Sequence, residues 1–149
     1  MSGKEANIYR VNGGVGAASS VKLVNQLLAG VHIAASAEAM ALAARLGLNT
    51  RQVFDVFRQS SAWSWMFENR VPQMLNADWT PHSALAIFVK DLGIVLDEAK
   101  RLRAFTPISS ISHALYLDGA ARGWTREADA GIVRFWEEDT GVSVHKSAS

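Results

Sequence analysis

Apolar residues recur along most of the chain with the three-to-four-residue spacing that places them on one face of a helix. Between residues 19 and 46 this pattern is unusually rich in alanine, which lets neighbouring helices approach closely and predicts a long, central, buried helix. We expect Ser19 or Ser20 to cap its beginning and Gly47 to stop it. The pattern therefore predicts a fold organised around one long helix.

Shorter helical patterns follow, the first of them capped by Asn49 or Thr50. The further helices are expected over residues 65–75, 84–103, 107–122 and 128–138. The one strand-like run, Ile8 to Val11, is too short to found a sheet within the chain. We therefore predict an all-α protein, a multi-helix bundle with a possible short vestigial N-terminal strand.

The predicted helices divide the chain into a helical domain over residues 13–139 and a polar tail over residues 140–149, which we expect to be mobile. The aromatic content is high for a bundle of this size, with five tryptophans and six phenylalanines. We expect some of these rings to lie at a subunit interface, and hence a homodimer. The candidates are Trp63, Trp65, Phe67, Trp124, Phe135 and Trp136.

Composition narrows the class of protein. The 149 residues are 49% hydrophobic, enough for one domain with a real core. Fifteen Lys and Arg nearly balance fourteen Asp and Glu, so we expect no nucleic-acid or anionic-membrane partner. Cysteine is absent, which excludes disulfides and thiol catalysis, and the polar start lacks signal-peptide features. These properties predict a cytoplasmic location.

The long helix carries a polar stripe, since five of its side chains fall within about a third of its circumference. They are Lys22, Asn25, Gln26, His32 and Ser36. The stripe is either the solvated side of an amphipathic helix or a wall of hydrogen-bonding groups lining a cleft for a small polar ligand. Lys22 lies in the first turn, where the helix dipole disfavours an ammonium, which suits a group that exchanges a proton with a hydroxyl. Spacing alone leaves open that Lys22 is a surface charge.

Other motifs are weaker. Gly14 and Gly16 fit the first two glycines of a dinucleotide G-x-G-x-x-G motif, but Ser19 occupies the third position and no second strand follows, so no self-contained nucleotide fold is expected. The pair Lys90 and Asp91 lies among apolar helix residues, and it is either a structural ion pair or a lysine facing a ligand. The four histidines have no metal-site spacing, so we predict no metal.

Three ordered segments resemble the β-hydroxyacid dehydrogenase family, which includes 3-hydroxyisobutyrate and 6-phosphogluconate enzymes. They are GGVGAASSVKLVNQ (13–26), AEAMALAARLGL (37–48) and FVKDLGIVLDEA (88–99). The resemblance implies a two-domain enzyme in which an N-terminal Rossmann domain binds NAD or NADP. A helical domain of the 6-phosphogluconate dehydrogenase C-terminal type completes the active site and dimerises. Residues 1–12 would then be the end of the Rossmann domain or a linker.

The resemblance also implies residue roles. Lys22 matches the catalytic lysine, the general acid or base on the substrate hydroxyl. Gln26, preceded by Asn25, falls where relatives have a substrate-binding asparagine, and Lys90 matches a lysine near the cofactor, with Asp91 orienting it. The alternative to this enzyme hypothesis is a noncatalytic helical dimerisation module with the same fold.

The substrate class follows from further segments of the same resemblance. QLLAGVHIAASAEAM (26–40), SWMFENR (64–70) and IFVKDLG (87–93) are similar to a branch acting on four-carbon sugar acids such as L-threonate. Gln26 in place of asparagine, and Ser83 where many relatives have phenylalanine, would make the pocket more polar. A polar pocket favours a polyhydroxylated acid.

Overall fold

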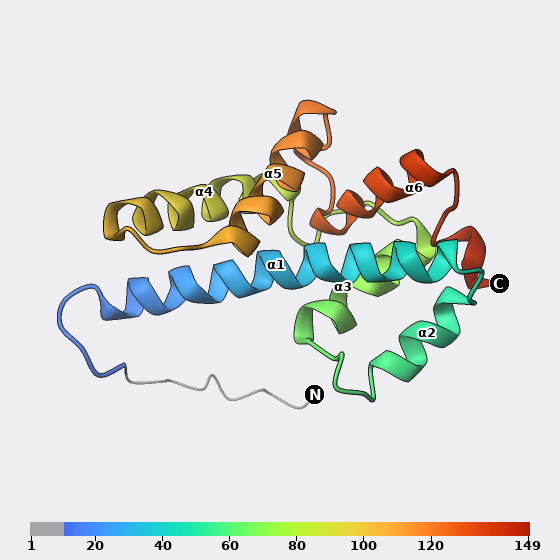
Figure 1. Cartoon of the computed structure of the whole chain (residues 1–149), viewed down its shortest axis with the longest axis horizontal. Coiled ribbons are helices and arrows are strands. Elements are labelled where there is room, and N and C mark those ends of the chain that lie inside the picture. Colours follow the sequence, from blue (N-terminus) through green and yellow to red (C-terminus); the bar gives the residue numbers. More distant parts are fainter. Residues whose placement is uncertain (1–10) are drawn as a thin grey trace.

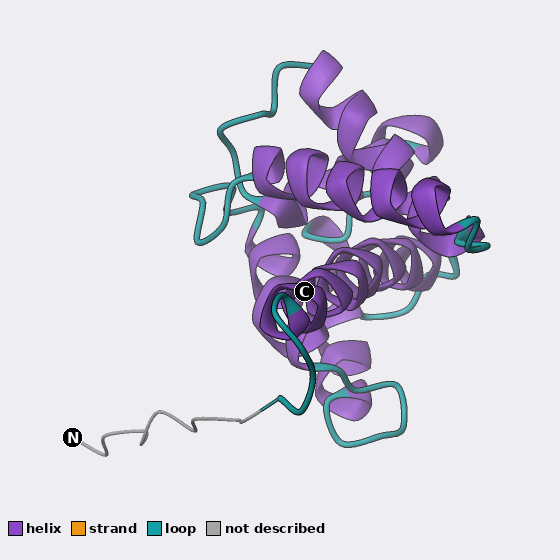
Figure 2. Ribbon diagram, turned by 90° about the vertical axis from the view of Figure 1, so that its left-hand side faces the viewer, coloured by secondary structure: helices purple, strands orange, loops and turns teal. Residues whose placement is uncertain are grey.

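The computed structural model describes residues 11–149, so the predicted strand-like run lies outside the described residues except for Val11, which belongs to no element. Within this range the fold has six α-helices, two short 3-10 helices and no strand (Figure 2). In chain order the elements are α1 (Ala17–Arg45), α2 (Thr50–Phe57), α3 (Trp65–Asn76), α4 (Leu85–Leu102), α5 (Pro107–Ala121), η1 (Asp129–Val133), α6 (Arg134–Thr140) and η2 (Lys146–Ala148). The predicted all-α bundle is confirmed.

Helix α1 is the central element, with α4 and α5 on one side of it and α2 and α3 on the other (Figure 1). Its beginning differs from the prediction, because Gly16 is the N-cap residue and Ser19 and Ser20 lie inside the first turn. Gly16 has φ 95°, a conformation that suits glycine, and Ser20 Oγ donates to its carbonyl at 3.2 Å. The turn into α1 is therefore made by the backbone of a glycine rather than by a serine cap.

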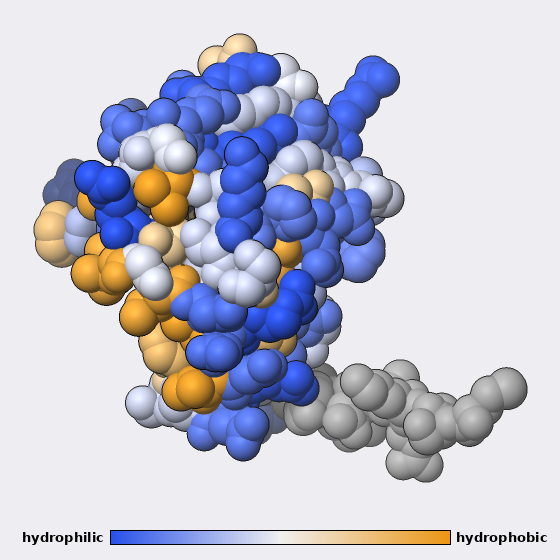
Figure 3. Space-filling model, turned by 90° about the vertical axis from the view of Figure 1, so that its right-hand side faces the viewer, coloured by the Kyte–Doolittle hydropathy of each residue, from blue (hydrophilic) through white to orange (hydrophobic). Residues whose placement is uncertain are grey.

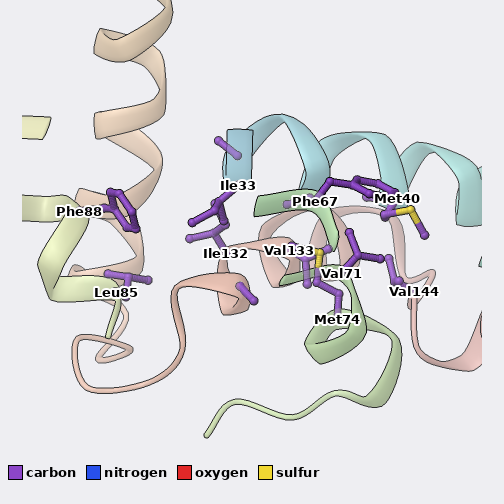
Figure 4. Packing of buried hydrophobic residues seen from close by; sticks show 14 of the residues in the cluster. Ile33, Met40, Phe67, Val71, Met74, Leu85, Phe88, Ile132, Val133 and Val144 are labelled. Atoms are coloured by element: carbon purple, nitrogen blue, oxygen red, sulfur yellow. The ribbon is translucent and has the colours of Figure 1, made fainter. Parts of the chain in front are cut away.

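The core lies beneath the second half of α1. Ile33 and Met40 point from α1 toward residues of α3, α4, η1 and the C-terminal segment (Figure 4). These partners include Phe67, Val71, Met74, Leu85, Phe88, Ile132, Val133 and Val144, all buried. The first buried residue of α1 is Ala29, so residues 17–28 carry no fully buried side chain. One half of α1 belongs to the core and the other half projects along α4.

Helix α1 is also long and apolar enough to cross a membrane, judged by length and composition alone. The most apolar stretch of 18 residues in this helix has a mean hydropathy of 1.6, and 56% of that stretch is buried inside the fold. The buried core helix of a bundle has this composition because its neighbours cover it on several sides. We therefore interpret the apolar character of α1 as that of a core helix.

Close contact between α1 and α4 depends on Gly30. A Cβ atom at this position would lie 2.9 Å from Phe88 Cδ1 and 3.1 Å from Leu92 Cδ1. Phe88 is not free to move aside, since its ring is buried and stacks on Tyr116 with centroids 5.3 Å apart. The Tyr116 hydroxyl in turn donates to the Gly30 carbonyl at 2.7 Å, which ties α5 to the same point of α1.

Replacing Gly30 with alanine is expected to lower the free energy of unfolding by about 1–3 kcal/mol, because the added methyl overpacks this contact. Gly93 in α4 is the matched control. A Cβ atom there meets His113 Nε2 at 3.5 Å, an ordinary contact, so Gly93→Ala should be neutral or slightly stabilising through helix propensity. Urea denaturation followed by circular dichroism measures both. Equal stability of the two variants would contradict the proposed packing.

A buried ion pair joins α3 to η1. Arg70 Nε donates to Asp129 Oδ1 at 2.7 Å, and the two side chains are 8% and 0% exposed. Burial raises the pKa of the Asp129 carboxyl, while the Arg70 guanidinium opposes that rise. Among the described residues, Asp129 Oδ2 has no hydrogen-bond partner. The charge of Asp129 is therefore tolerated in the core because Arg70 is beside it.

The C-terminal part of the chain differs from the prediction in two ways. The single helix expected over residues 128–138 is divided into η1 and α6, and Asp129 at the start of η1 is buried against Arg70. The tail expected to be mobile is docked against α2 and α3. Val144 is fully buried, Thr50 Oγ1 donates to its carbonyl at 2.8 Å, and His145 Nδ1 lies 2.9 Å from Leu75 O.

The aromatic residues expected at an interface fall into two groups. Phe67 is buried and Trp124, Phe135 and Trp136 are partly buried in the core, where the Arg134 guanidinium lies 3.9 Å from the Trp124 ring centroid. Trp63 and Trp65 remain 47% and 56% exposed. Apolar side chains also gather in one zone of the face at the C-terminal end of the fold (Figure 3). An interface role stays a prediction for the exposed rings alone.

Candidate functional site

The candidate site is an open cleft of about 280 Å³ between the projecting half of α1 and the middle of α4. Lys22 and Gln26 enter it from α1, because residues four apart lie on one face of a helix. Lys90 and Asp91 face them from α4. The contact at Gly30, one turn further along α1, sets the separation of the two helices. The structure thus brings together three of the four predicted site residues, together with Asp91.

Hydrogen bonds connect the polar groups of the cleft. Gln26 Nε2 donates to Asp91 Oδ2 at 2.7 Å, and Asn25 Nδ2 donates to Gln26 Oε1 at 3.2 Å. Lys90 Nζ lies 3.6 Å from Asp91 Oδ1. The Asp91 side chain is only 17% exposed, whereas that of Lys90 is 72% exposed. Two ammonium groups and one carboxylate therefore line the cleft, which gives it a net positive charge.

The two lysines are more exposed than the sequence suggested. Lys22 is exposed near the beginning of α1, so the described residues do not desolvate its amine. Lys90 is exposed as well, because it lies on the side of α4 opposite to the buried residues of that helix. The two interpretations of Lys90 are compatible, since it pairs with Asp91 and also lines the cleft.

The rest of the predicted polar stripe lies on another side of α1. Asn25 and His32 line a cleft of about 460 Å³ together with Trp63 and Trp65, and His32 and Ser36 line a neighbouring one of about 380 Å³. Ser36 is buried and donates to His32 O at 2.6 Å, so its hydroxyl is satisfied within α1. The stripe is therefore divided, and Asn25 reaches the Lys22 cleft only through Gln26.

Ser83 does not contribute to the polarity of the cleft, contrary to the expectation. It lies before α4, where its carbonyl accepts from Asp129 N at 3.0 Å, and it is not among the described residues that line the cleft. Sequence reasoning also missed Leu23 and Ile94, which complete the lining. The sequence could have indicated Ile94, because residues four apart lie on one face of a helix and Ile94 follows Lys90 by four positions. Among residues 11–149 no group of three His, Asp or Glu side chains is placed to hold a metal ion.

The sequence is similar to known proteins along most of its length. Residues 16–136 match the family described as NAD-binding of NADP-dependent 3-hydroxyisobutyrate dehydrogenase. The chain is 47% identical to L-threonate dehydrogenase of Cupriavidus necator and 45% identical to that of Escherichia coli K12, each over 129 residues. These matches cover 87% of this chain and 43% of each relative.

The fold of the chain is also similar to that of a solved structure. The crystal structure of a 3-hydroxyisobutyrate dehydrogenase from Salmonella typhimurium superposes with a TM-score of 0.84 at 46% identity. The superposition covers 87% of this chain and 46% of that chain. The chain thus spans less than half the length of the relatives that it matches.

Proposed function

The chain belongs to the NAD-binding 3-hydroxyisobutyrate dehydrogenase family, and from this premise we propose that it is the substrate-side helical domain of an NAD- or NADP-dependent hydroxyacid dehydrogenase. The observation that carries the proposal is the α1–α4 cleft, in which the amine of Lys22, the amide of Gln26 and the ammonium of Lys90 converge. An N-terminal Rossmann domain would close the open side of this cleft and hold most of the cofactor.

The charge of the cleft supports an anionic substrate of small size. Lys90 balances Asp91, and Lys22 in its ammonium form adds one positive charge that can face the carboxylate of a hydroxyacid or of its oxidised product. The Gln26 amide can hydrogen-bond to a substrate hydroxyl, and Asn25 supports it by donating to Gln26 Oε1. The cleft thus offers cations for the carboxylate and an amide for a hydroxyl of a hydroxyacid.

Lys22 is the group proposed to move the proton. In the direction of oxidation its neutral amine takes the proton from the substrate hydroxyl while the carbinol carbon loses hydride, and the hydroxyl carbon becomes a carbonyl. In the reverse direction the ammonium returns the proton to the carbonyl oxygen. Because Lys22 is exposed among the described residues, closure by the Rossmann domain would supply the desolvation that favours the neutral amine.

Among the described residues that line the cleft, Lys90 is the one proposed to contact the dinucleotide. Its ammonium is exposed at the open edge of the cleft, where it can meet a phosphate or carboxamide oxygen. When bound, NAD or NADP supplies the ring that accepts the hydride. Asp91 holds the Lys90 side chain on the cleft side of α4 through the 3.6 Å contact.

L-threonate is the substrate that we propose within the hydroxyacids. Its support is the name of the relatives that are 45–47% identical, together with the Gln26 amide that lines the cleft. We also propose that the enzyme is a cytoplasmic homodimer, with the exposed Trp63 and Trp65 at its interface.

The two-domain protein, with a Rossmann domain preceding this chain, is expected to reduce NAD or NADP with L-threonate. Its kcat/KM for L-threonate should exceed that for 3-hydroxyisobutyrate by about tenfold or more, because the less hydroxylated acid leaves the Gln26 amide in the cleft without a partner. The 149-residue chain alone should give no turnover. Cofactor absorbance measures each reaction. Turnover by the isolated chain would contradict the shared site, and a preference for 3-hydroxyisobutyrate would contradict the substrate.

A further inference from the structure

The shortest polar contact in the cleft joins two groups that neither transfer the proton nor accept the hydride. Gln26 Nε2 and Asp91 Oδ2 are 2.7 Å apart, although the two residues are 65 positions apart in sequence and lie on different helices. The acceptor is a carboxylate, which makes the hydrogen bond charge-assisted. Because the Asp91 side chain is 17% exposed, water competes weakly for it.

This bond determines which way the Gln26 amide faces. An ionised carboxylate can only accept, so Nε2 must face Asp91 and Oε1 must face away from it. Oε1 then accepts from Asn25 Nδ2 at 3.2 Å, which agrees with the same orientation. One N–H of Gln26 remains for a ligand in the cleft, so Gln26 offers a hydrogen-bond donor to a substrate oxygen.

We propose that Asp91 is a positioning residue that holds the Gln26 amide with its N–H toward the substrate, an inference that rests on the proposed dehydrogenase function. Asp91 also contacts Lys90 through its other oxygen, so one carboxylate orients both a substrate-binding group and a cofactor-binding group. It acts through these neighbours and needs no contact with the reacting atoms. The side chain at position 26 must be long enough to cross from α1 to α4.

Because the two side chains must together span the gap between α1 and α4, shortening one of them and lengthening the other tests the proposal. Gln26→Asn shortens one partner by a methylene and should break the bond, and Asp91→Glu lengthens the other partner by a methylene. In the two-domain enzyme we expect Asp91→Ala and Gln26→Asn each to raise KM for L-threonate by about 10- to 100-fold. kcat should change by less than about threefold, since the lost contact serves substrate binding in the ground and transition states alike.

Adding Asp91→Glu to Gln26→Asn should then recover at least about half of the loss on a logarithmic scale, as a restored pairwise interaction does. A general structural role for Asp91 would not give this recovery. Asp97→Ala is the matched control, because Asp97 is an exposed carboxylate of α4 outside the cleft lining, and KM should not change. Absence of recovery in the double variant, or an equal KM effect of Asp97→Ala, would overturn the proposal.

Nuclear magnetic resonance tests the positioning without catalysis. In the ¹⁵N-labelled 149-residue chain, the side-chain NH₂ signals of Gln26, assigned by their loss in Gln26→Asn, should differ from those of Gln52, which is exposed on α2. In Asp91→Ala they should move toward the Gln52 signals. Unchanged Gln26 signals would overturn the proposed positioning. Absence of turnover with hydroxyacids would contradict the proposed function while leaving this test valid.

Discussion

Replacing Lys22 with alanine in the two-domain protein is expected to lower kcat for hydroxyacid oxidation by about 10²–10⁴-fold, the usual contribution of a positioned acid–base group. The physical reason is that Lys22 is the one amine that faces the Gln26–Asp91 pair from α1. Little change in stability is expected, because Lys22 is exposed and makes no core contact. Steady-state kinetics measure the rate, and thermal denaturation checks the fold.

Two control variants separate proton transfer from charge. Lys22→Arg keeps a positive charge but cannot release its proton near neutral pH, so its kcat should fall nearly as far as that of Lys22→Ala. Lys100→Ala removes an exposed lysine of α4 outside the cleft and should leave kcat unchanged. A near-normal rate in Lys22→Arg would show that Lys22 acts by charge alone. A near-normal rate in Lys22→Ala would favour the noncatalytic dimerisation module.

Replacing Arg70 with methionine is expected to lower the free energy of unfolding by about 3–5 kcal/mol at neutral pH, because it leaves the Asp129 carboxylate buried without a counter-charge. Methionine keeps much of the volume of the arginine stem, so the loss reports charge rather than a cavity. Asp129→Asn added to Arg70→Met should recover part of the stability by removing the charge. Urea denaturation measures both variants.

The loss in Arg70→Met should depend on pH in a defined direction. Burial already raises the pKa of Asp129 above its unfolded value, and removing Arg70 removes the group that opposes this rise. As the pH falls through the raised folded-state pKa, the folded variant takes up a proton before the unfolded chain does, so the destabilisation becomes smaller. Arg58→Met, which breaks the exposed pair with Glu68, should cost about 1 kcal/mol or less. A cost independent of pH would contradict an unpaired Asp129 charge.

The sequence predicted the helices well, because their apolar spacing and end signals are local. Asn49 caps α2 as expected and its side chain accepts from Gln52 N, and α5 begins at Pro107 as expected. Gly47 follows the end of α1 with φ 76°. Ser19 or Ser20 was a wrong prediction for the cap of α1, since the sequence does not reveal that the backbone at Gly16 makes the turn by itself.

Features that join distant segments could not be predicted in the same way. The Arg70–Asp129 pair and the Gln26–Asp91 bond each connect residues about 60 positions apart, and nothing in either local sequence identifies the partner. Val144 appears in the sequence as one of two valines in a largely polar tail, yet it is fully buried and completes the core beneath α1. Placing Lys22 and Lys90 in one cleft came from the family resemblance, which carries tertiary information that periodicity lacks.

The unequal burial of the two halves of α1 determines what holds Lys22 and Gln26 in place. From Ala29 onward the helix is buried in the core, whereas the part that carries Lys22 and Gln26 is supported mainly along α4. The close packing of Gly30 against Phe88 and Leu92 fixes where this part of the helix, and with it Lys22 and Gln26, lies along α4. We expect a domain that packs on the exposed Val21 and Val24 to hold this part of the helix, and therefore the Lys22 amine, more firmly.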